Sequence, residues 1–342
     1  MNENYKFSDL NDAAKEPELN EEEIKTINRL GLIPEDLQRL VGGSPVAEGS
    51  YALIFELPND KKTIAKVWKN PKSDAGRADH ENAALRLLRL RKSQEAPRLN
   101  GYLKSSAIIF EEKIEGSPIK CYDKKSINQL AEALAKIHSI KLNAFGKPLT
   151  ERIEGTQLDY LMEGIKRLRD SLSNSTGSDE SIFLISKVIE KTEDLAMKKK
   201  ESFQNNNFTL IHFDLNRNNI LRSSSSDKII IVDWEQASAG DNAMDIAKMF
   251  LKLNFDEEQK SCFLTEYEKG FSKKDEHFQD RLDIYEPLVA VNSVLWRLRA
   301  LKNKSTQRSA ESENEKQFYI QVQSGLESEI AKLNNFLNTR IE

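Results

Sequence analysis

The segment from His212 to Asp233 carries acidic and amide side chains at a spacing that suits phosphoryl transfer. It reads HFDLNRNN from position 212, and DWE follows at position 233. Phosphoryl transfer requires an attacking hydroxyl held in line and a divalent metal that neutralises phosphate charge. Asp214 could accept the hydroxyl proton, while Asn219 and Asp233 could offer oxygen ligands to Mg²⁺. Each residue alone could be a turn former or a capping residue, but their combined spacing favours phosphoryl transfer.

The same segment resembles the aminoglycoside phosphotransferase and choline kinase superfamily, whose members are small-molecule relatives of protein kinases. The resemblance spans about residues 46–300, and LIHFDLNRNNIL and IIIVDWEQASAGDNAMDIA carry its most specific part. It implies that Asp214 is the catalytic aspartate and that Asn219 and Asp233 bind the metal. It also implies ATP as the phosphoryl donor, with Mg²⁺ bridging the phosphates.

Other polar residues near this segment fit supporting roles. Glu235, Asp241 and Asp245 also fall on the superfamily pattern. We expect Asp241 and Asp245 to be buried or capping acids without a direct catalytic role. His138, on the apolar face of a helix, is expected to be a packing residue, and His212 is expected to brace the catalytic loop.

The smaller lobe is expected to supply the phosphate-binding groups. Gly49 and Ser50 lie in AEGSYA before a strand, where backbone N–H groups could cover the phosphates, although an ordinary β-turn explains one glycine as well. Lys66 lies in the middle of the strand TIAKVW. Glu81 shares a helical face with apolar residues three, four and seven positions later, so its carboxylate should face inward and need a cation. The resemblance implies that Lys66 is this cation and that it binds phosphate; the alternative is two unrelated solvated charges.

The run IIFEEKIEG, at residues 108–116, resembles the linker between the lobes in this superfamily. In those proteins the backbone of the linker pairs with adenine. Alignment to Gly116 makes Glu112 and Ile114 the candidate adenine-binding residues. Gly116 is also the expected boundary between the lobes.

The expected elements of the first part of the chain are a helix followed by a small sheet. Residues 1–40 should form a helical extension, in which Asn20 and Glu23 make a capping box and Gly31 ends the helix. Residues 41–116 should form the first lobe. It contains a hairpin from ALIFEL and TIAKVW, a helix around ENAALRLLRLRK, and strands near Tyr102 and at AIIFEEKI.

Helical patterns dominate residues 117–342, which should form the second lobe. Two short β-type runs, FTLIHFDL and KIIIVDWE, interrupt the helices, and we expect them to be paired strands that bring the acidic residues together. The serine run at 223–226 reads as a hairpin tip. The expected fold is therefore α+β and bilobal, similar to protein kinases, with a small antiparallel-sheet lobe and a larger, mostly helical lobe.

Composition is consistent with an enzyme of two lobes, because 342 residues exceed the size at which a single core usually stops growing. The 51 basic and 55 acidic side chains give a net charge of −4, and no charge block suggests a nucleic-acid partner. Cys121 and Cys262 form no CxxC pair, which argues against disulfides or zinc and favours a reducing cytoplasm. The amino terminus is polar and no long apolar run occurs, so we expect no membrane segment.

These observations predict an ATP-dependent kinase that phosphorylates a hydroxyl of a small molecule, such as an aminoglycoside, a choline-like amino alcohol or a related metabolite. One alternative is a catalytically inactive binding module with the same fold, which the intact polar residues disfavour. A second is an atypical protein kinase, disfavoured because DWE replaces DFG and too few residues follow for an activation loop. The oligomeric state stays open.

The acceptor is expected to bind to the helical lobe. Acidic and aromatic side chains there could hold a cationic amine. The candidates are Glu266, Tyr267, Glu286 and Trp296. The sequence around Trp296 reads equally well as an amphipathic core helix.

Overall fold

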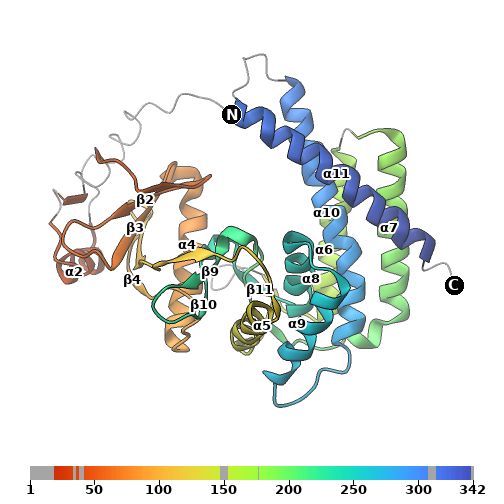
Figure 1. Cartoon of the computed structure of the whole chain (residues 1–342), viewed down its shortest axis with the longest axis horizontal. Helices are drawn as coiled ribbons and strands as arrows, with labels where there is room; N and C mark the ends of the chain where they lie inside the picture. Colours follow the sequence, from red (N-terminus) through yellow and green to blue (C-terminus); the bar gives the residue numbers. More distant parts are fainter. Residues whose placement is uncertain are drawn as a thin grey trace.

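The computed structural model describes residues 19–33, 36–37, 42–146, 153–175, 177–306 and 313–339. Two parts lie next to each other (Figure 1): one holds β2, β3, β4, α2 and α4, and the other holds the helices from α5 to α11. The predicted α+β fold, with a small antiparallel sheet and a larger helical part, is confirmed. Residues 1–18 of the predicted extension, and its boundary at residue 40, lie outside the described residues.

A five-stranded antiparallel sheet forms the smaller part, with strand order β1-β2-β3-β5-β4. Its strands are β1 (Ala47–Glu48), β2 (Ala52–Glu56), β3 (Thr63–Trp68), β4 (Leu99–Leu103) and β5 (Ile108–Glu112). The predicted hairpin between ALIFEL and TIAKVW is confirmed as β2 and β3. Because partners directly opposite each other share a face, Lys66 and its partner Ile109 point to the same side of the sheet.

Helix α2 (Glu21–Arg29) covers one face of this sheet. The predicted capping box is confirmed, since the Asn20 side chain accepts from the backbone of Glu23 and the Glu23 carboxylate accepts from the backbone of Asn20. Gly31 has a φ of +66°, which suits a residue that ends a helix. Ile27 is buried with Phe55, Val67 and other apolar residues of the sheet.

Helix α4 (Pro71–Leu90) covers the opposite face and is longer than the predicted ENAALRLLRLRK. It begins at Pro71, where a proline costs no hydrogen bond, and Asn70 caps it by accepting from Ser73 N at 3.4 Å. Its buried residues include Ala84, Leu85 and Leu88, as the pattern predicts. Glu81 lies on the same side and is fully buried.

Two small sheets lie in the second part. One has the order β10-β9-β6 and the other β11-β8-β7. Their strands are β6 (Gly116–Pro118), β9 (Ile220–Ser223), β10 (Ile229–Ile231), β7 (Lys141–Leu142), β8 (Phe208–Ile211) and β11 (Ser238–Gly240). The prediction that FTLIHFDL pairs with KIIIVDWE was wrong. The segment ILRS between them forms β9 and takes β10 as its hairpin partner, with the serine run at the tip as predicted, while β8 lies between β7 and β11.

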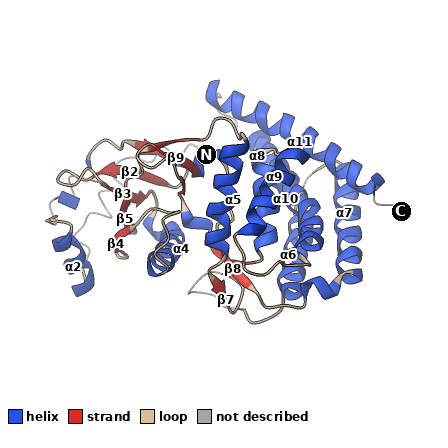
Figure 2. Ribbon diagram, turned by 60° about the horizontal axis from the view of Figure 1, so that its bottom comes forward, coloured by secondary structure: helices blue, strands red, loops and turns tan. Residues whose placement is uncertain are grey.

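Seven helices of the described chain build the rest of the second part (Figure 2). They are α5 (Lys124–His138), α6 (Gln157–Ser173), α7 (Asp179–Lys198), α8 (Asn242–Leu253), α9 (Glu257–Lys269), α10 (Phe278–Thr306) and α11 (Glu313–Thr339). Their apolar faces share one core with α4 and part of the first sheet. No helix in the described ranges combines the length and the apolar character needed to cross a bilayer.

The chain passes from the first part to the second through residues 113–115. Lys113 N donates to Lys62 O at 2.8 Å, which ties it to the first part. Glu115 O accepts from Ser224 N at 2.8 Å, which ties it to the β9–β10 hairpin. A Cβ on Gly116 would lie 2.4 Å from Arg222 O, so the close approach of β6 to β9 requires glycine.

Candidate active site

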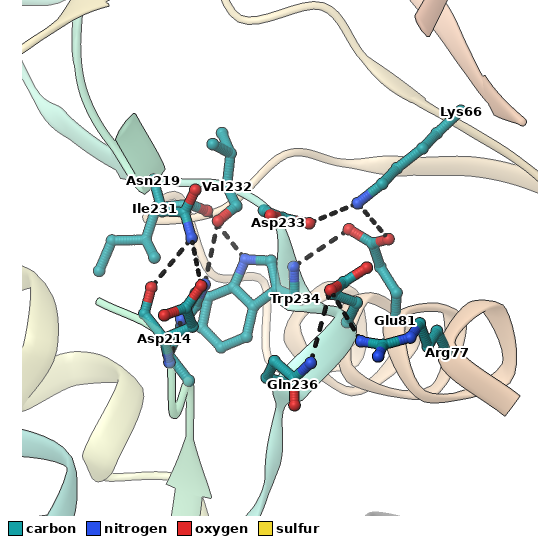
Figure 3. A network of polar contacts seen from close by, with 12 residues as sticks. Lys66, Arg77, Glu81, Asp214, Asn219, Ile231, Val232, Asp233, Trp234 and Gln236 are labelled. Carbon is teal, nitrogen blue, oxygen red and sulfur yellow. Dashed lines mark hydrogen bonds and ion pairs between the residues drawn. The ribbon is translucent and has the colours of Figure 1, made fainter. Parts of the chain in front are cut away.

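Lys66 joins the two parts of the molecule (Figure 3). Its Nζ lies 2.7 Å from Glu81 Oε2 and 2.5 Å from Asp233 Oδ1. Strand β3 and helix α4 bring the lysine and the glutamate together on one face of the sheet, while Asp233 follows β10. The other oxygen of Glu81 accepts from Trp234 N at 3.0 Å. Glu81 therefore holds both the lysine and the backbone next to Asp233.

The charges in this cluster are unequal in number. Burial alone would lower the pKa of the Lys66 ammonium, but Glu81 and Asp233 outweigh it and raise that pKa. Burial would raise the pKa of Asp233, but the ammonium of Lys66 outweighs it and keeps that pKa low. Burial raises the pKa of Glu81 to about 7. Lys66 therefore stays charged, and the cluster carries more carboxylates than it has cations.

Glu111 adds another carboxylate that the sequence analysis assigned no role. It follows Ile109 by two positions in β5, so it points to the same side of the sheet as Lys66. The side chain is buried, and its Oε2 has no hydrogen-bond partner in the part of the chain that the structure describes. Burial raises its pKa to about 8, and the nearby charge of Glu81 adds to the effect. The position of Glu111 in a strand whose three preceding residues are all apolar is the signal that could have identified this buried acid.

Asp214 lies in the loop after β8, and its carboxylate is oriented by two amides. Asn216 Nδ2 donates to Asp214 Oδ2 at 3.1 Å, and Asn219 Nδ2 donates to the same oxygen at 3.4 Å and to the backbone carbonyl of Asp214 at 2.9 Å. His212 lies beneath this loop, where its Nε2 lies 3.0 Å from Val232 O and its Nδ1 accepts from Asp214 N at 3.2 Å. The structure thus brings Asp214 and Asn219 together and links their loop to the residue before Asp233.

The buried acids Asp241 and Asp245 support this arrangement, as the sequence predicts. Asp241 caps α8 and pairs with the buried Arg281, with Oδ2 2.8 Å from Nε. Asp245 accepts from the backbone N–H groups of His212 and Phe213 at 2.9 and 2.8 Å. It also pairs with the fully buried His138 at 3.2 Å. Asp245 thus orients the loop that carries Asp214, whereas Asp241 fixes the start of α8.

The backbone is strained at the two points where the loops leave their strands. Phe213 has a φ of +66° and Asp233 a φ of +68°, values that side chains other than glycine adopt at an energetic cost. Trp234 stabilises the second bend, because its indole donates to Ile231 O at 2.8 Å and its ring lies against His212. The strain turns the Asp233 carboxylate toward Lys66, and 38% of that side chain is exposed.

The loop with Gly49 and Ser50 joins β1 to β2. Gly49 N donates to Ala52 O at 2.9 Å, and a Cβ on Gly49 would make only an ordinary contact, so the turn itself does not require glycine. At the loop tip, the ring of Tyr51 stacks with the guanidinium of Arg77, 3.8 Å from the ring centroid. Arg77 also pairs with Glu235 at 3.1 Å. Arg77, which sequence reasoning missed, thus connects this loop to the residues after Asp233.

Glu112 and Ile114, the candidate adenine-binding residues, differ in which of their backbone groups already form hydrogen bonds. Glu112 N donates to Arg98 O at 2.9 Å, so its N–H is occupied and only its carbonyl could face a ligand. The N–H of Ile114 has no hydrogen-bond partner among the described residues. A carbonyl and an N–H two residues apart are the pair of groups that one edge of a purine can engage.

The four acceptor candidates of the helical part do not form one site in the described structure. Tyr267 is buried and bonded to His138 and Asn242. The other three have separate partners. Glu266 pairs with Lys269, Glu286 with Lys260, and Trp296 with the ring of Phe318. The two glutamates are thus already paired with lysines, Glu266 within α9 and Glu286 between α10 and α9.

The side-chain oxygens that Asn219 and Asp233 could offer suit a bound metal ion. Asp233 has a partly exposed carboxylate, and the amide nitrogen of Asn219 is used by Asp214, which leaves its oxygen for a ligand. No cluster of three or more His, Cys, Asp or Glu that could hold a metal occurs in the described part of the chain. Two oxygen ligands completed by phosphate oxygens and water suit Mg²⁺.

The lysine–glutamate pair, the aspartate opposite it and the HxDxxxxN loop define a phosphotransferase of the kinase-like fold that acts on an alcohol group. The model of the choline/ethanolamine kinase family matches residues 57–285. The chain belongs to this family. The predicted resemblance to the aminoglycoside phosphotransferase and choline kinase superfamily is therefore confirmed.

Solved structures show the same fold at low sequence identity. A choline/ethanolamine kinase family protein from Mesorhizobium loti is 17% identical, with 93% of this chain and 95% of that chain covered and a TM-score of 0.60. An ethanolamine kinase from Plasmodium vivax is 16% identical, with 97% and 95% covered and a TM-score of 0.60. The GDP complex of aminoglycoside 2'-phosphotransferase-IIIa is 14% identical, with 84% and 92% covered and a TM-score of 0.57. No curated protein matches the chain.

Proposed function

We propose that this protein transfers the γ-phosphoryl group of ATP to a hydroxyl of a small alcohol, with Asp214 as the catalytic base. Residues 41–116 would form the lobe that binds the nucleotide, and residues 117–342 the lobe that binds the acceptor. Membership of the choline/ethanolamine kinase family supports a small alcohol as the acceptor. The short segment from Trp234 to the helix cap at Asp241 leaves no room for an activation loop, which disfavours a protein substrate.

The residues of the first part would bind the nucleotide. The Glu112 carbonyl and the Ile114 N–H would pair with adenine, and the N–H groups of the Gly49–Ser50 loop would cover the phosphates. Lys66 would bind phosphate oxygens with its ammonium, which Glu81 holds at 2.7 Å. Because Lys66 contacts Asp233 at 2.5 Å in this structure, phosphate oxygens would replace that contact or share it.

The residues of the second part would position the acceptor hydroxyl and the metal. The carboxylate of Asp214 would accept the hydroxyl proton as the oxygen attacks, and Asn216 and Asn219 would keep it pointing at that oxygen. Asn219 and Asp233 would hold Mg²⁺, which neutralises charge on the phosphates when it is bound.

The contact of Lys66 with Asp233 is the observation that carries this proposal. The candidate phosphate-binding lysine and the candidate metal-binding aspartate lie close enough to act on the same bound phosphate group. The decisive experiment measures MgATP binding by calorimetry and ADP release with a panel of small alcohols. MgATP binding together with alcohol-dependent ADP release is expected. An inactive binding module would release no ADP with any alcohol, and a protein that does not bind MgATP would contradict the proposal entirely.

A further inference from the structure

One face of helix α8 lies along the loop that carries Asp214. Lys248 and Lys252 follow Asp245 by three and seven positions, so all three side chains lie on that face. Asp245 fixes its direction, because its carboxylate accepts from the N–H groups of His212 and Phe213 at 2.9 and 2.8 Å. The next side chains along this face are therefore the two lysines.

The ammonium of Lys248 is held next to Asp214. Its Nζ donates to Phe213 O at 2.7 Å and lies 3.6 Å from the centroid of the Phe213 ring. Burial lowers the pKa of Lys248 to about 8, against which Asp214 and Asp245 favour the charged form, while Lys252 opposes it. One N–H of the ammonium is used by Phe213 O, and no further hydrogen bond or ion pair of Lys248 occurs among the described residues. The other N–H groups are free to bind a ligand.

Two more cations lie on the elements just described, Lys252 on α8 and Arg217 three positions after Asp214. Lys252 is exposed and forms no ion pair within the described ranges. The guanidinium of Arg217 donates to Lys120 O at 3.2 Å and Leu253 O at 3.5 Å, and it lies over the ring of Tyr122. These partners are carbonyls and a ring rather than carboxylates, so the positive charge of Arg217 is not neutralised. Lys248 is thus the cation held beside Asp214, and Lys252 lies next to Lys248 on the same helix face.

A positively charged acceptor would be unfavourable in these surroundings. Its hydroxyl must lie within roughly 3 Å of the Asp214 carboxylate, which places its neighbouring atoms a few ångströms from the face of α8. Like charges at such short range repel strongly in a partly buried site, because water screens them weakly there. The glutamates that could have offset this repulsion, Glu266 and Glu286, are paired with lysines of their own.

We propose that the acceptor is an anionic hydroxy compound, whose carboxylate or phosphate group binds Lys248 and Lys252 while its hydroxyl faces Asp214. This inference rests on the proposed function. The hydroxyl oxygen forms a bond to the γ-phosphorus, the bond from that phosphorus to the β–γ bridging oxygen breaks, and the proton passes to Asp214. ADP leaves, and the product is a phosphate ester that carries the original anion.

A panel of acceptors in three charge classes tests this inference. ADP release is measured with choline and ethanolamine as cations, glycerol as a neutral compound, and glycerate and glycerol 3-phosphate as compounds with an anionic group. We expect at least one compound with an anionic group to exceed every cation and glycerol by roughly tenfold or more in kcat/KM. A cation or glycerol as the best acceptor, or no turnover of any anionic compound by a protein that binds MgATP, would overturn the inference. The first of these outcomes leaves the proposed function intact, whereas loss of MgATP binding contradicts the function itself.

Charge reversal on α8 gives the second test. Lys252 is exposed, so Lys252→Glu should fold, which thermal unfolding can verify. We expect it to raise the KM of the best anionic acceptor by roughly tenfold or more with a smaller change in kcat, and Lys252→Arg to restore the KM. Lys198→Glu, at an exposed position of α7, is the matched control and should leave KM unchanged. An unchanged KM in Lys252→Glu would mean that this lysine binds no acceptor, and that Lys248 only braces the Phe213 carbonyl.

Discussion

Lys66 Nζ lies 2.5 Å from Asp233 Oδ1, although the two residues are 167 positions apart in the chain. One belongs to a strand of the first sheet and the other follows a strand of a separate small sheet. Neither residue would be placed there by its own element alone, because Asp233 reaches Lys66 only through a left-handed backbone conformation. This contact is the point at which both halves of the proposed site can be tested together.

We expect Asp214→Asn to lower turnover by roughly 10²- to 10⁴-fold, the usual cost of losing a general base. The amide keeps the shape of the carboxylate, so folding and MgATP affinity should change little. Steady-state kinetics with an acceptor identified by ADP release, together with calorimetry, measures both effects. Wild-type turnover in a pure Asp214→Asn preparation would remove Asp214 from the catalytic role.

Asp233→Ala should abolish the Mg²⁺-dependent part of ATP binding, because it removes a metal ligand. Titration calorimetry with ATP, in the presence of Mg²⁺ or of a chelator, isolates that part. Asp170→Ala is a suitable control, since Asp170 is an exposed acid of α6. The metal site would be misplaced if the Asp233 variant bound MgATP with the affinity of the control.

Lys66→Met and Glu81→Gln should be non-additive. Methionine keeps an apolar stem but removes the ammonium, so kcat/KM should fall while the strand persists. If Glu81 acts by holding Lys66 at 2.7 Å, its replacement should cost little once the ammonium is gone. A double-mutant cycle in kcat/KM tests this, and simple additivity would disprove the pairing.

Glu111→Gln should change how stability depends on pH. The folded-state pKa of Glu111 is raised to about 8, so the native state retains a proton that the unfolded chain releases near its ordinary pKa. Wild-type stability should therefore fall relative to the variant as pH rises from about 4.5 to 8, and the difference should level off above that. The side chains of Lys66, Glu81 and Asp233 are present in both proteins, so the ionisation of Glu81, with its pKa of about 7, contributes to both pH profiles.

Urea unfolding of both proteins at pH 5 and pH 8 measures this effect. Between pH 5 and pH 8, we expect the free energy of unfolding of the wild type to fall by roughly 1 to 3 kcal/mol relative to that of the variant. Equal pH profiles would show that Glu111 ionises normally. A variant that fails to fold at pH 5 would show that the carboxyl group has a structural role that the amide cannot fill.

The sequence predicted the elements that local chemistry determines. Asn20 and Glu23 form the expected capping box, and TIAKVW forms the expected strand with Lys66 turned toward Glu81. The start of α4 was missed because its first turns are polar and contain Gly76, so no apolar period marks them, although Asn70 and Pro71 are a helix-start signal.

Long-range pairing was beyond local patterns. Two apolar runs near each other suggested one hairpin, yet β8 and β10 belong to different sheets, because the shorter connection through β9 supplies a closer partner for β10. The positive charge of Lys248 near Asp214 could not be predicted from the sequence either. DIAKMFLK reads as an amphipathic helix, and only the contacts of Asp245 show that Lys248 faces Asp214 and not solvent.

The connection at residues 113–115 has a mechanical consequence. Lys113 is bonded to one half of the molecule and Glu115 to the other. Ile114 lies between these two attachments and forms no backbone hydrogen bond to either half among the described residues. Any rotation of the two halves that passes through this connection must be taken up by the torsions around Ile114. The proposed adenine contact therefore lies between the two attachments. A bound base would restrict how far the two halves of the molecule can rotate relative to each other.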